Sequence, residues 1–330
     1  MLDKHNREIN YLRISVTDRC NLRCIYCMPK EGVSVIGHDD ILRYEEILRI
    51  VKAAVKLGIV KARVTGGEPL VRRGIIQFLG TLSAIPEIRE TSITTNGLLL
   101  CKVAEQLRGA GVRRINVSLD SLRPERYAEI TRGGDIRKVM EGIAKAHEAG
   151  LSPIKINMVP LKGINEGEVV DFARLTLKLP YQVRFIELMP FEKADSAFES
   201  EYLSNELIEE KIRELYELDE ITPDEGDAHG PAKLFRIRGA KGKIGFISSI
   251  SRHFCSSCNR LRLTADGHLR SCLFSDQELD LKGPLRAGCT DEELGELINE
   301  SIRKKPAFSD QNRKNPAIKK CAKGMSAIGG

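Results

Sequence analysis

The sequence predicts an α/β protein built on a partial (β/α)6 barrel of the TIM-like kind, followed by a smaller C-terminal region. Six short β-prone runs recur in the first two thirds of the chain, stretches with helical periodicity separate them, and polar residues gather where the runs end. Strands that alternate with helices pair in parallel, and the carboxyl ends of such strands carry the functional residues. An open, doubly wound parallel sheet is the alternative architecture.

The individual elements follow from local patterns. We expect strands at residues 11–16, 61–67, 91–97, 113–120, 154–160 and 182–189. The clearest helix covers residues 44–58, where apolar side chains repeat at helical spacing before Gly58 ends the run. The sequence contains no internal repeat.

The pattern changes near residue 218. A turn-rich segment at residues 221–232 precedes two runs, 233–239 and 241–250, that indicate a β-hairpin instead of another strand–helix unit. We therefore expect residues 1–218 to form the barrel and residues 219–330 the C-terminal region. The basic stretch at residues 301–323 is expected to be a solvated surface.

The composition indicates a cytoplasmic globular protein. Of 330 residues, 42% are hydrophobic and 30% charged, and the N-terminus has no apolar segment typical of a signal peptide. The net charge of +6 permits an anionic ligand without requiring one. Nine cysteines in a reducing compartment point to metal binding or catalysis, because disulfides are rare there.

Three of these cysteines lie within eight residues. Cys20, Cys24 and Cys27 follow a C-x₃-C-x₂-C spacing, which differs from the paired C-x₂-C of zinc ribbons and from the ferredoxin run. The spacing favours three thiolate ligands on a four-iron cubane. One iron would then lack a protein ligand and could bind an exogenous group.

A second trio consists of Cys255, Cys258 and Cys272. A turn at residues 266–268 is expected to close a hairpin that returns Cys272 to the other two cysteines. A second cluster with an open iron is one interpretation, and a Cys₃His zinc site with His253 or His268 is the other. The remaining cysteines, Cys101, Cys289 and Cys321, are expected to be inert.

The first cysteine motif, with Tyr26 before its last cysteine, resembles the signature of the radical S-adenosylmethionine (SAM) enzymes. Together with TGGEPLVRR, TTNGLLL, NVSLDSL, FCSSCNRLRLTADG and the terminal GMSAIGG, it resembles the MoaA family of GTP 3′,8-cyclases along essentially the whole chain. The resemblance implies two [4Fe–4S] clusters, with SAM on the open iron of the first cluster and the second cluster in the C-terminal region.

Enzymes of that family are lyases that catalyse the first step of molybdenum cofactor biosynthesis. Reductive cleavage of SAM gives a 5′-deoxyadenosyl radical, which abstracts the ribose 3′ hydrogen of GTP. The carbon radical attacks C8 of the guanine, and reduction gives 3′,8-cyclo-7,8-dihydro-GTP. The resemblance implies an external electron donor and a downstream pterin-forming enzyme as partners, and a homodimer is one assembly that the sequence allows.

The resemblance also assigns residues. The six cysteines of the two trios would hold the clusters, and Tyr26, Gly67, Ser118 and Met189 would line the SAM site. Arg13, Arg63, Thr94, Lys155, Arg260 and Arg262 would bind GTP. Arg260, Arg262, Gly329 and Gly330 would complete the catalytic site, where the small terminal residues can enter a narrow channel.

The cationic strand residues point to an anion without the family likeness. Arg13, Arg63 and Lys155 lie within strands of a parallel sheet, where both faces are covered and a buried cation needs a counter-charge.

Two other functions remain as alternatives: a radical SAM peptide maturase, and a zinc-stabilised nucleic-acid-binding protein. The second leaves the first cysteine motif unexplained, and we expect no nucleic-acid or membrane partner.

Overall fold

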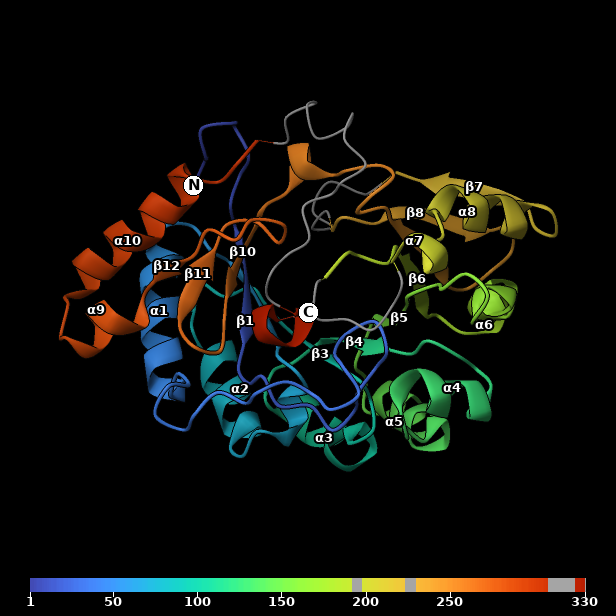
Figure 1. The fold of residues 1–330 in the computed structure, drawn as a ribbon, viewed down its shortest axis with the longest axis horizontal. Helices are drawn as coiled ribbons and strands as arrows, with labels where there is room; N and C mark the ends of the chain where they lie inside the picture. The colour runs from blue at the N-terminus through green and yellow to red at the C-terminus, as the bar shows by residue number, and fades with distance from the viewer. Residues whose placement is uncertain (192–197, 223–229, 308–323, 330) are drawn as a thin grey trace.

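The fold is centred on one curved sheet with helices around its outer side (Figure 1). A computed structural model describes residues 1–191, 198–222, 230–307 and 324–329. Across these residues, twelve strands form a single sheet in the order β12-β11-β10-β1-β2-β3-β4-β5-β6-β9-β8-β7. Their bounds are β1 Tyr11–Ser15, β2 Lys61–Thr65, β3 Glu90–Thr95, β4 Arg114–Ser118, β5 Ile154–Met158, β6 Gln182–Ile186, β7 Leu218–Ile221, β8 Lys233–Ile237, β9 Lys243–Ile247, β10 Arg260–Leu263, β11 His268–Arg270 and β12 Leu279–Asp280.

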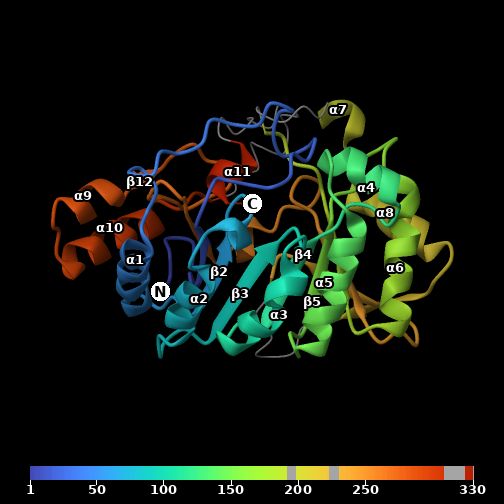
Figure 2. The ribbon, with the colours of Figure 1, turned by 90° about the horizontal axis from the view of Figure 1, so that it is seen from below.

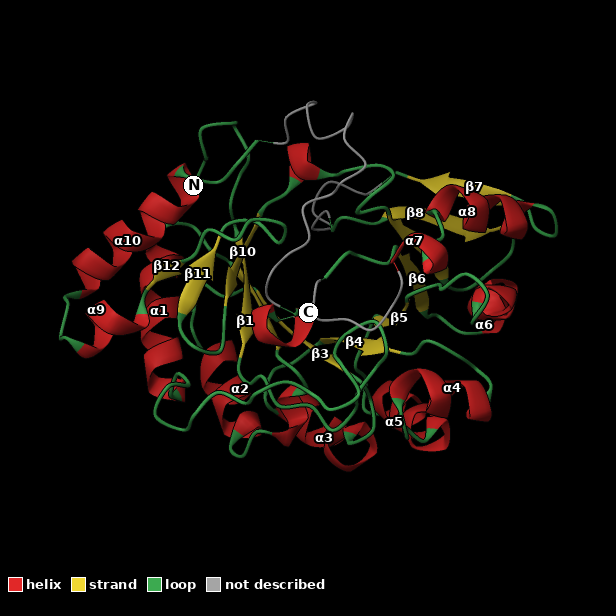
Figure 3. Ribbon diagram, in the orientation of Figure 1, coloured by secondary structure: helices red, strands yellow, loops and turns green. Residues whose placement is uncertain are grey.

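Helices alternate with strands β1 to β6 and cover the convex side of the sheet, whereas α11 lies on the concave side (Figures 2 and 3). The helices of the described residues are α1 Tyr44–Lys56, α2 Ile75–Ser83, α3 Leu100–Gly109, α4 Pro124–Thr131, α5 Ile136–Glu148, α6 Val169–Lys178, α7 Phe198–Glu201, α8 Asn205–Arg213, α9 Lys282–Arg286, α10 Asp291–Arg303 and α11 Met325–Ile328. Three short 3₁₀ turns are η1 Pro69–Val71, η2 Glu166–Glu168 and η3 Cys255–Ser257.

The alternation predicted from the sequence is confirmed. Strands β1 to β6 occupy the six expected runs and pair in parallel with their neighbours along the chain. Helix α1 lies within the predicted range of residues 44–58. Because the strand order is linear across the described residues, the sheet forms a partial barrel, as expected.

The strands after residue 218 extend this sheet at both edges. The predicted hairpin is present as antiparallel β8 and β9, but β9 also pairs in parallel with β6. At the opposite edge, β10 pairs in parallel with β1. Strand β7 is an additional element, antiparallel to β8, that the turn-rich composition did not predict. The division of the chain at residue 218 stays a prediction, since both regions contribute strands to the same sheet.

The inner strands alternate between two environments. In β1, Leu12 and Ile14 are fully buried beneath the helices, whereas Arg13 between them faces the inside of the curved sheet. Strand β2 repeats the pattern with Ala62 and Val64 around Arg63. The concave side therefore lines a cavity with polar residues, while the convex side forms the hydrophobic core.

Within the described ranges, no helix combines the length and the apolar character that a membrane span requires.

Candidate active site

Both cysteine trios line one cavity of about 300 Å³ on the concave side of the sheet. The first trio is in the loop after β1, and the second is in the segment that enters β10 and leaves β11. All six cysteines are partly buried free thiols. The predicted hairpin of β10 and β11 is antiparallel, with Arg262 opposite Arg270, and it returns Cys272 to the cavity beside Cys255 and Cys258.

The loop of the first trio is held by its own backbone and by the glycines after β2. Cys27 N donates to Cys24 O at 2.9 Å, and Leu22 N donates to Cys20 Sγ at 3.4 Å. Gly67 N donates to Thr17 O at 2.7 Å, just before the cysteine motif begins. A Cβ on Gly67 would lie 2.3 Å from Arg19 O. Gly67 is thus required for close approach of two backbone segments, and it also lines the cavity.

Two thiols of the first trio, Cys20 and Cys24, favour the protonated state. Burial raises the pKa of Cys24 well above its ordinary value, and the negative charges of Asp120, Cys27 and Cys20 raise it further. Burial also raises the pKa of Cys20. A thiolate at these positions needs a positive partner, and a metal that displaces the proton supplies one.

Tyr26 ties the cysteine loop to the carboxyl end of β4. Its hydroxyl donates to Asp120 Oδ2 at 2.7 Å, and Asp120 Oδ1 accepts from Val159 N at 2.9 Å. Burial raises the pKa of Asp120 to about 6, against the lowering effect of these hydrogen bonds. Asp120 lines the cavity, yet the sequence analysis did not single it out.

The second trio lies among cations. Burial raises the pKa of Cys255 to about 11. For Cys258 burial acts in the same direction, but the nearby charges of Arg260 and Lys305 outweigh it and lower the pKa to about 7. Lys305 Nζ donates to Cys258 Sγ at 3.5 Å. Cys258 therefore reaches the thiolate state more readily than Cys24.

The two histidines that the zinc alternative names differ in their surroundings. His253 lines the cavity, whereas His268 pairs with Asp266, Nδ1 to Oδ1, at 3.2 Å. Three thiolates without a fourth protein ligand are the donor set of a cubane with one open iron.

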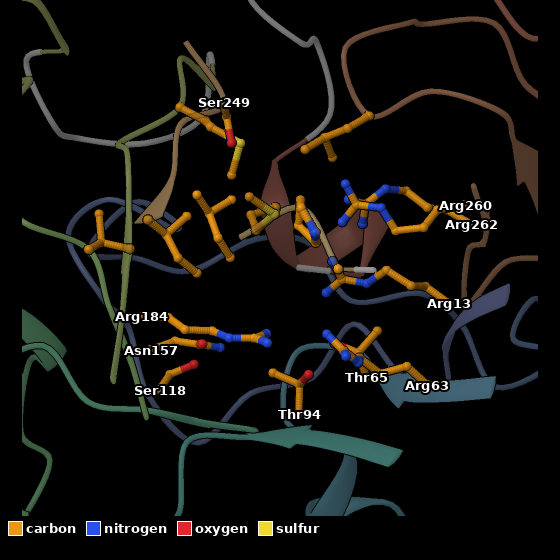
Figure 4. A pocket seen from close by; sticks show the side chains of 18 of the residues that line it. Arg13, Arg63, Thr65, Thr94, Ser118, Asn157, Arg184, Ser249, Arg260 and Arg262 are labelled. Carbon is orange, nitrogen blue, oxygen red and sulfur yellow. The ribbon is translucent and has the colours of Figure 1, made fainter. Parts of the chain in front are cut away.

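Eight lysines and arginines from six strands line the cavity. Arg114 pairs with Glu90, and Lys61 begins β2. The other six are Arg13, Arg63, Lys155, Arg184, Arg260 and Arg262, and Figure 4 labels the arginines among them. The sheet register places three of them side by side, because Arg13 is opposite Arg262 on β10 and opposite Arg63 on β2. Five of the six are the strand cations that the sequence analysis named. Arg184 on β6 satisfies the same rule and was missed.

The cations of the cavity are buried and repel one another electrostatically. Burial and then the charges of Arg184 and Arg63 lower the pKa of Lys155 to about 6. Burial and neighbouring arginines lower the pKa of Arg184 and of Arg262 to about 9. Such a cluster favours a polyanion between the charged groups, and guanidinium forks suit phosphate oxygens.

Opposite the arginine row, Figure 4 shows Ser118, Asn157 and Arg184 from β4, β5 and β6. Ser118 is in register with Asn157, and Asn157 with Arg184. The buried Thr94 Oγ1, Asn157 Oδ1 and Arg184 Nε have no hydrogen-bond partner among the described residues. These polar atoms are therefore available to a ligand. Thr94, Ser118 and Met189, all predicted from the sequence, line the same cavity.

The C-terminal segment enters the cavity. Gly329 O accepts a hydrogen bond from Arg262 Nη1 at 2.9 Å. Gly329 has φ +74°, and a Cβ there would lie 2.9 Å from Ser15 Cβ, so this position requires glycine. Ile328 is 1% exposed and packs with Phe191 and Met189. The other predicted terminal residue, Gly330, lies outside the described residues, as does Cys321.

Two family models match the chain. The Radical SAM superfamily matches residues 14–176, and Molybdenum Cofactor Synthesis C matches residues 181–310. A GTP 3′,8-cyclase from Alkaliphilus metalliredigens is 48% identical, with all of both chains covered. A GTP 3′,8-cyclase from Pelotomaculum thermopropionicum is 52% identical over 93% of this chain and 94% of the relative.

A solved structure shares the fold. Streptococcus suis SuiB matches with a TM-score of 0.60 and 15% identity, over 97% of this chain and 78% of that chain. At this identity the likeness concerns the architecture alone.

The contact between Gly67 and Arg19 predicts that Gly67→Ala separates the two segments and displaces the loop of Cys20. We expect a loss of about 1–3 kcal/mol in the free energy of unfolding and less iron bound by the first trio. Gly80→Ala on α2 is the control, since its Cβ would meet nothing within 4 Å. Urea unfolding and iron analysis measure both effects. Wild-type stability and iron content in Gly67→Ala would contradict this account.

Proposed function

Since this chain belongs to the GTP 3′,8-cyclase family of radical SAM enzymes, we infer that its cavity binds SAM and GTP between two [4Fe–4S] clusters and converts GTP to 3′,8-cyclo-7,8-dihydro-GTP. This reaction is the first step of molybdenum cofactor biosynthesis. The observation that carries the proposal is the convergence of eight strand cations on a cavity lined by two cysteine trios.

The residues present fit the two clusters. Each trio supplies three thiols on one side of the shared cavity. Cys20, Cys24 and Cys27 would hold the first cluster, and Cys255, Cys258 and Cys272 the second. When bound, the first cluster supplies the electron that cleaves SAM to a 5′-deoxyadenosyl radical.

The chain positions and shields the reactants. The row of Arg262, Arg13 and Arg63 would hold the triphosphate, with Arg260, Lys155 and Arg184 completing its charge neutralisation. Thr94, with its buried hydroxyl, lies at the same wall. These contacts would fix the ribose of GTP relative to the cofactor.

The cofactor side of the cavity would use Tyr26, Gly67, Ser118 and Met189. Tyr26 is held by Asp120, so a hydrogen bond joins the cysteine loop to the segment after β4. Met189 packs against α11, which brings the C-terminal segment over the cavity. Gly329 accepts from Arg262 and would help to orient that arginine toward GTP. We assign Gly330 to the same role by its position in the sequence.

The wider setting is also proposed. An external one-electron donor would reduce the clusters, and a downstream pterin-forming enzyme would consume the product. We place the protein in the cytoplasm, where a homodimer is one assembly that it could form. Residues 1–218 would form the radical SAM core, and residues 219–330 the region that binds the second cluster.

Turnover tests the substrate and the cofactor together. Anaerobically reconstituted protein, given SAM, dithionite and GTP, is expected to release 5′-deoxyadenosine only when GTP is present, together with a cyclised GTP product. Cys24→Ala should abolish both products. Cys101→Ala, at an exposed cysteine on α3, is the matched control and should retain them. If 5′-deoxyadenosine forms without any GTP-derived product, the substrate assignment fails.

The low pKa of Lys155 predicts that the protein takes up a proton when GTP binds. In the ligand-free cavity its pKa is about 6, so at about pH 8 the amine is neutral. A triphosphate favours the ammonium and raises this pKa. Binding therefore takes up a proton between pH 6 and the raised pKa, and the affinity for GTP falls as the pH rises.

Isothermal titration calorimetry in buffers of different ionisation enthalpy measures this uptake. Lys155→Met should lose it, whereas Lys102→Met, at an exposed lysine on α3, should behave as wild type. Unchanged proton uptake in Lys155→Met would show that Lys155 does not face the phosphates.

A further inference from the structure

One buried lysine near the second trio has no role in the function described so far. Lys305 follows α10 and is 2% exposed, although the adjacent Lys304 side chain is 67% exposed. No ion pair between Lys305 and a carboxylate is present in the described part of the chain. A buried ammonium costs several kcal/mol unless its charge is compensated. The structure must therefore supply another partner.

The partners are all parts of the second cysteine site. Lys305 Nζ donates to Cys258 Sγ at 3.5 Å, to Arg260 O at 2.9 Å and to Ser271 O. These contacts use the three donors of the ammonium group. Cys258 and Arg260 lie at the start of β10, and Ser271 lies just after β11, next to Cys272. Lys305 thus joins the two chain segments that carry the trio.

The chain holds Lys305 in this position from its other side. Arg7 Nη2 donates to Pro306 O at 2.9 Å, and Arg7 Nη1 donates to Cys255 O at 2.9 Å. Arg7 is in turn fixed by a buried ion pair with Asp3 at 2.6 Å. A single guanidinium therefore connects the backbone after Lys305 to the first cysteine of the trio. The lysine and the trio are parts of one buried framework.

We propose that Lys305 is a positioning residue of the second iron–sulfur cluster, which holds the Cys258 thiolate by an N–H···S hydrogen bond and stabilises the reduced cluster through its charge. A cation and a sulfur hydrogen bond both favour an added electron on such a cluster. The proposal rests on the proposed function, which places a cluster on Cys255, Cys258 and Cys272.

The reduction potential of the second cluster tests the proposal. The full chain with Cys20, Cys24 and Cys27 replaced by alanine serves as the parent, so that the measured iron belongs to the second trio alone. Into this parent we would introduce Lys305→Met, Lys305→Gln and Lys305→Arg, with Lys304→Met as the matched surface control. Redox titration followed by electron paramagnetic resonance gives the midpoint, and metal analysis gives iron per chain.

We expect Lys305→Met and Lys305→Gln to lower the ratio of reduced to oxidised cluster at least about tenfold at a fixed potential, a downward shift of about 59 mV for one electron. Loss of iron from a variant whose metal-free melting temperature is unchanged would also support the proposal. Lys305→Arg, which keeps the charge, should remain near the parent, and Lys304→Met should match it.

Full iron content and an unchanged midpoint in Lys305→Met overturn the proposal. Should that variant fail to fold, Lys305→Gln and Lys305→Arg decide: equal midpoints for the two reject a role for the charge. If the parent itself binds no iron, the assignment of a second cluster fails, and that failure is distinct from a failure of the Lys305 assignment.

Discussion

The pairing of β10 with β1 is the constraint on which the site depends. These strands lie about 250 residues apart in the chain, yet they pair in parallel with Tyr11 opposite Arg260 and Arg13 opposite Arg262. Because the first trio follows β1 and the second lies on both sides of the β10–β11 hairpin, this pairing brings both trios to one cavity. Without it the chain would hold two unrelated cysteine motifs. The C-terminal region is therefore a part of the active-site wall.

The same register concentrates positive charge. Neighbouring strands are about 4.8 Å apart, so Arg262, Arg13 and Arg63 present three guanidinium groups at one level of the sheet. Burial, and then the repulsion between these charges, lower the pKa of Arg13, Lys155 and Arg184, and a bound polyanion relieves that repulsion. A peptide without acidic side chains would leave this charge uncompensated.

Much of this could be predicted from local patterns. The β1 to β6 strands, the hairpin of β10 and β11 and the two trios all follow from short-range periodicity and spacing. Arg184 was within reach too, because a cation in a buried parallel strand is the same signal that identified Arg13. In contrast, the pairing of β9 with β6 and the contacts of Lys305 join segments far apart in sequence, which periodicity does not encode. Gly67 shows a third case: the glycine was recognised, but its steric partner is the backbone of Arg19.

The central claim is that two iron clusters, each held by three cysteines, face one another across the cavity. An anomalous difference map at the iron edge, from crystals of the anaerobically reconstituted protein with GTP, tests it directly. We predict two multi-iron peaks bordering the same cavity, one at each trio, with no histidine ligand on either. A single iron peak, or a zinc-edge signal at Cys255, Cys258 and Cys272, would contradict the account.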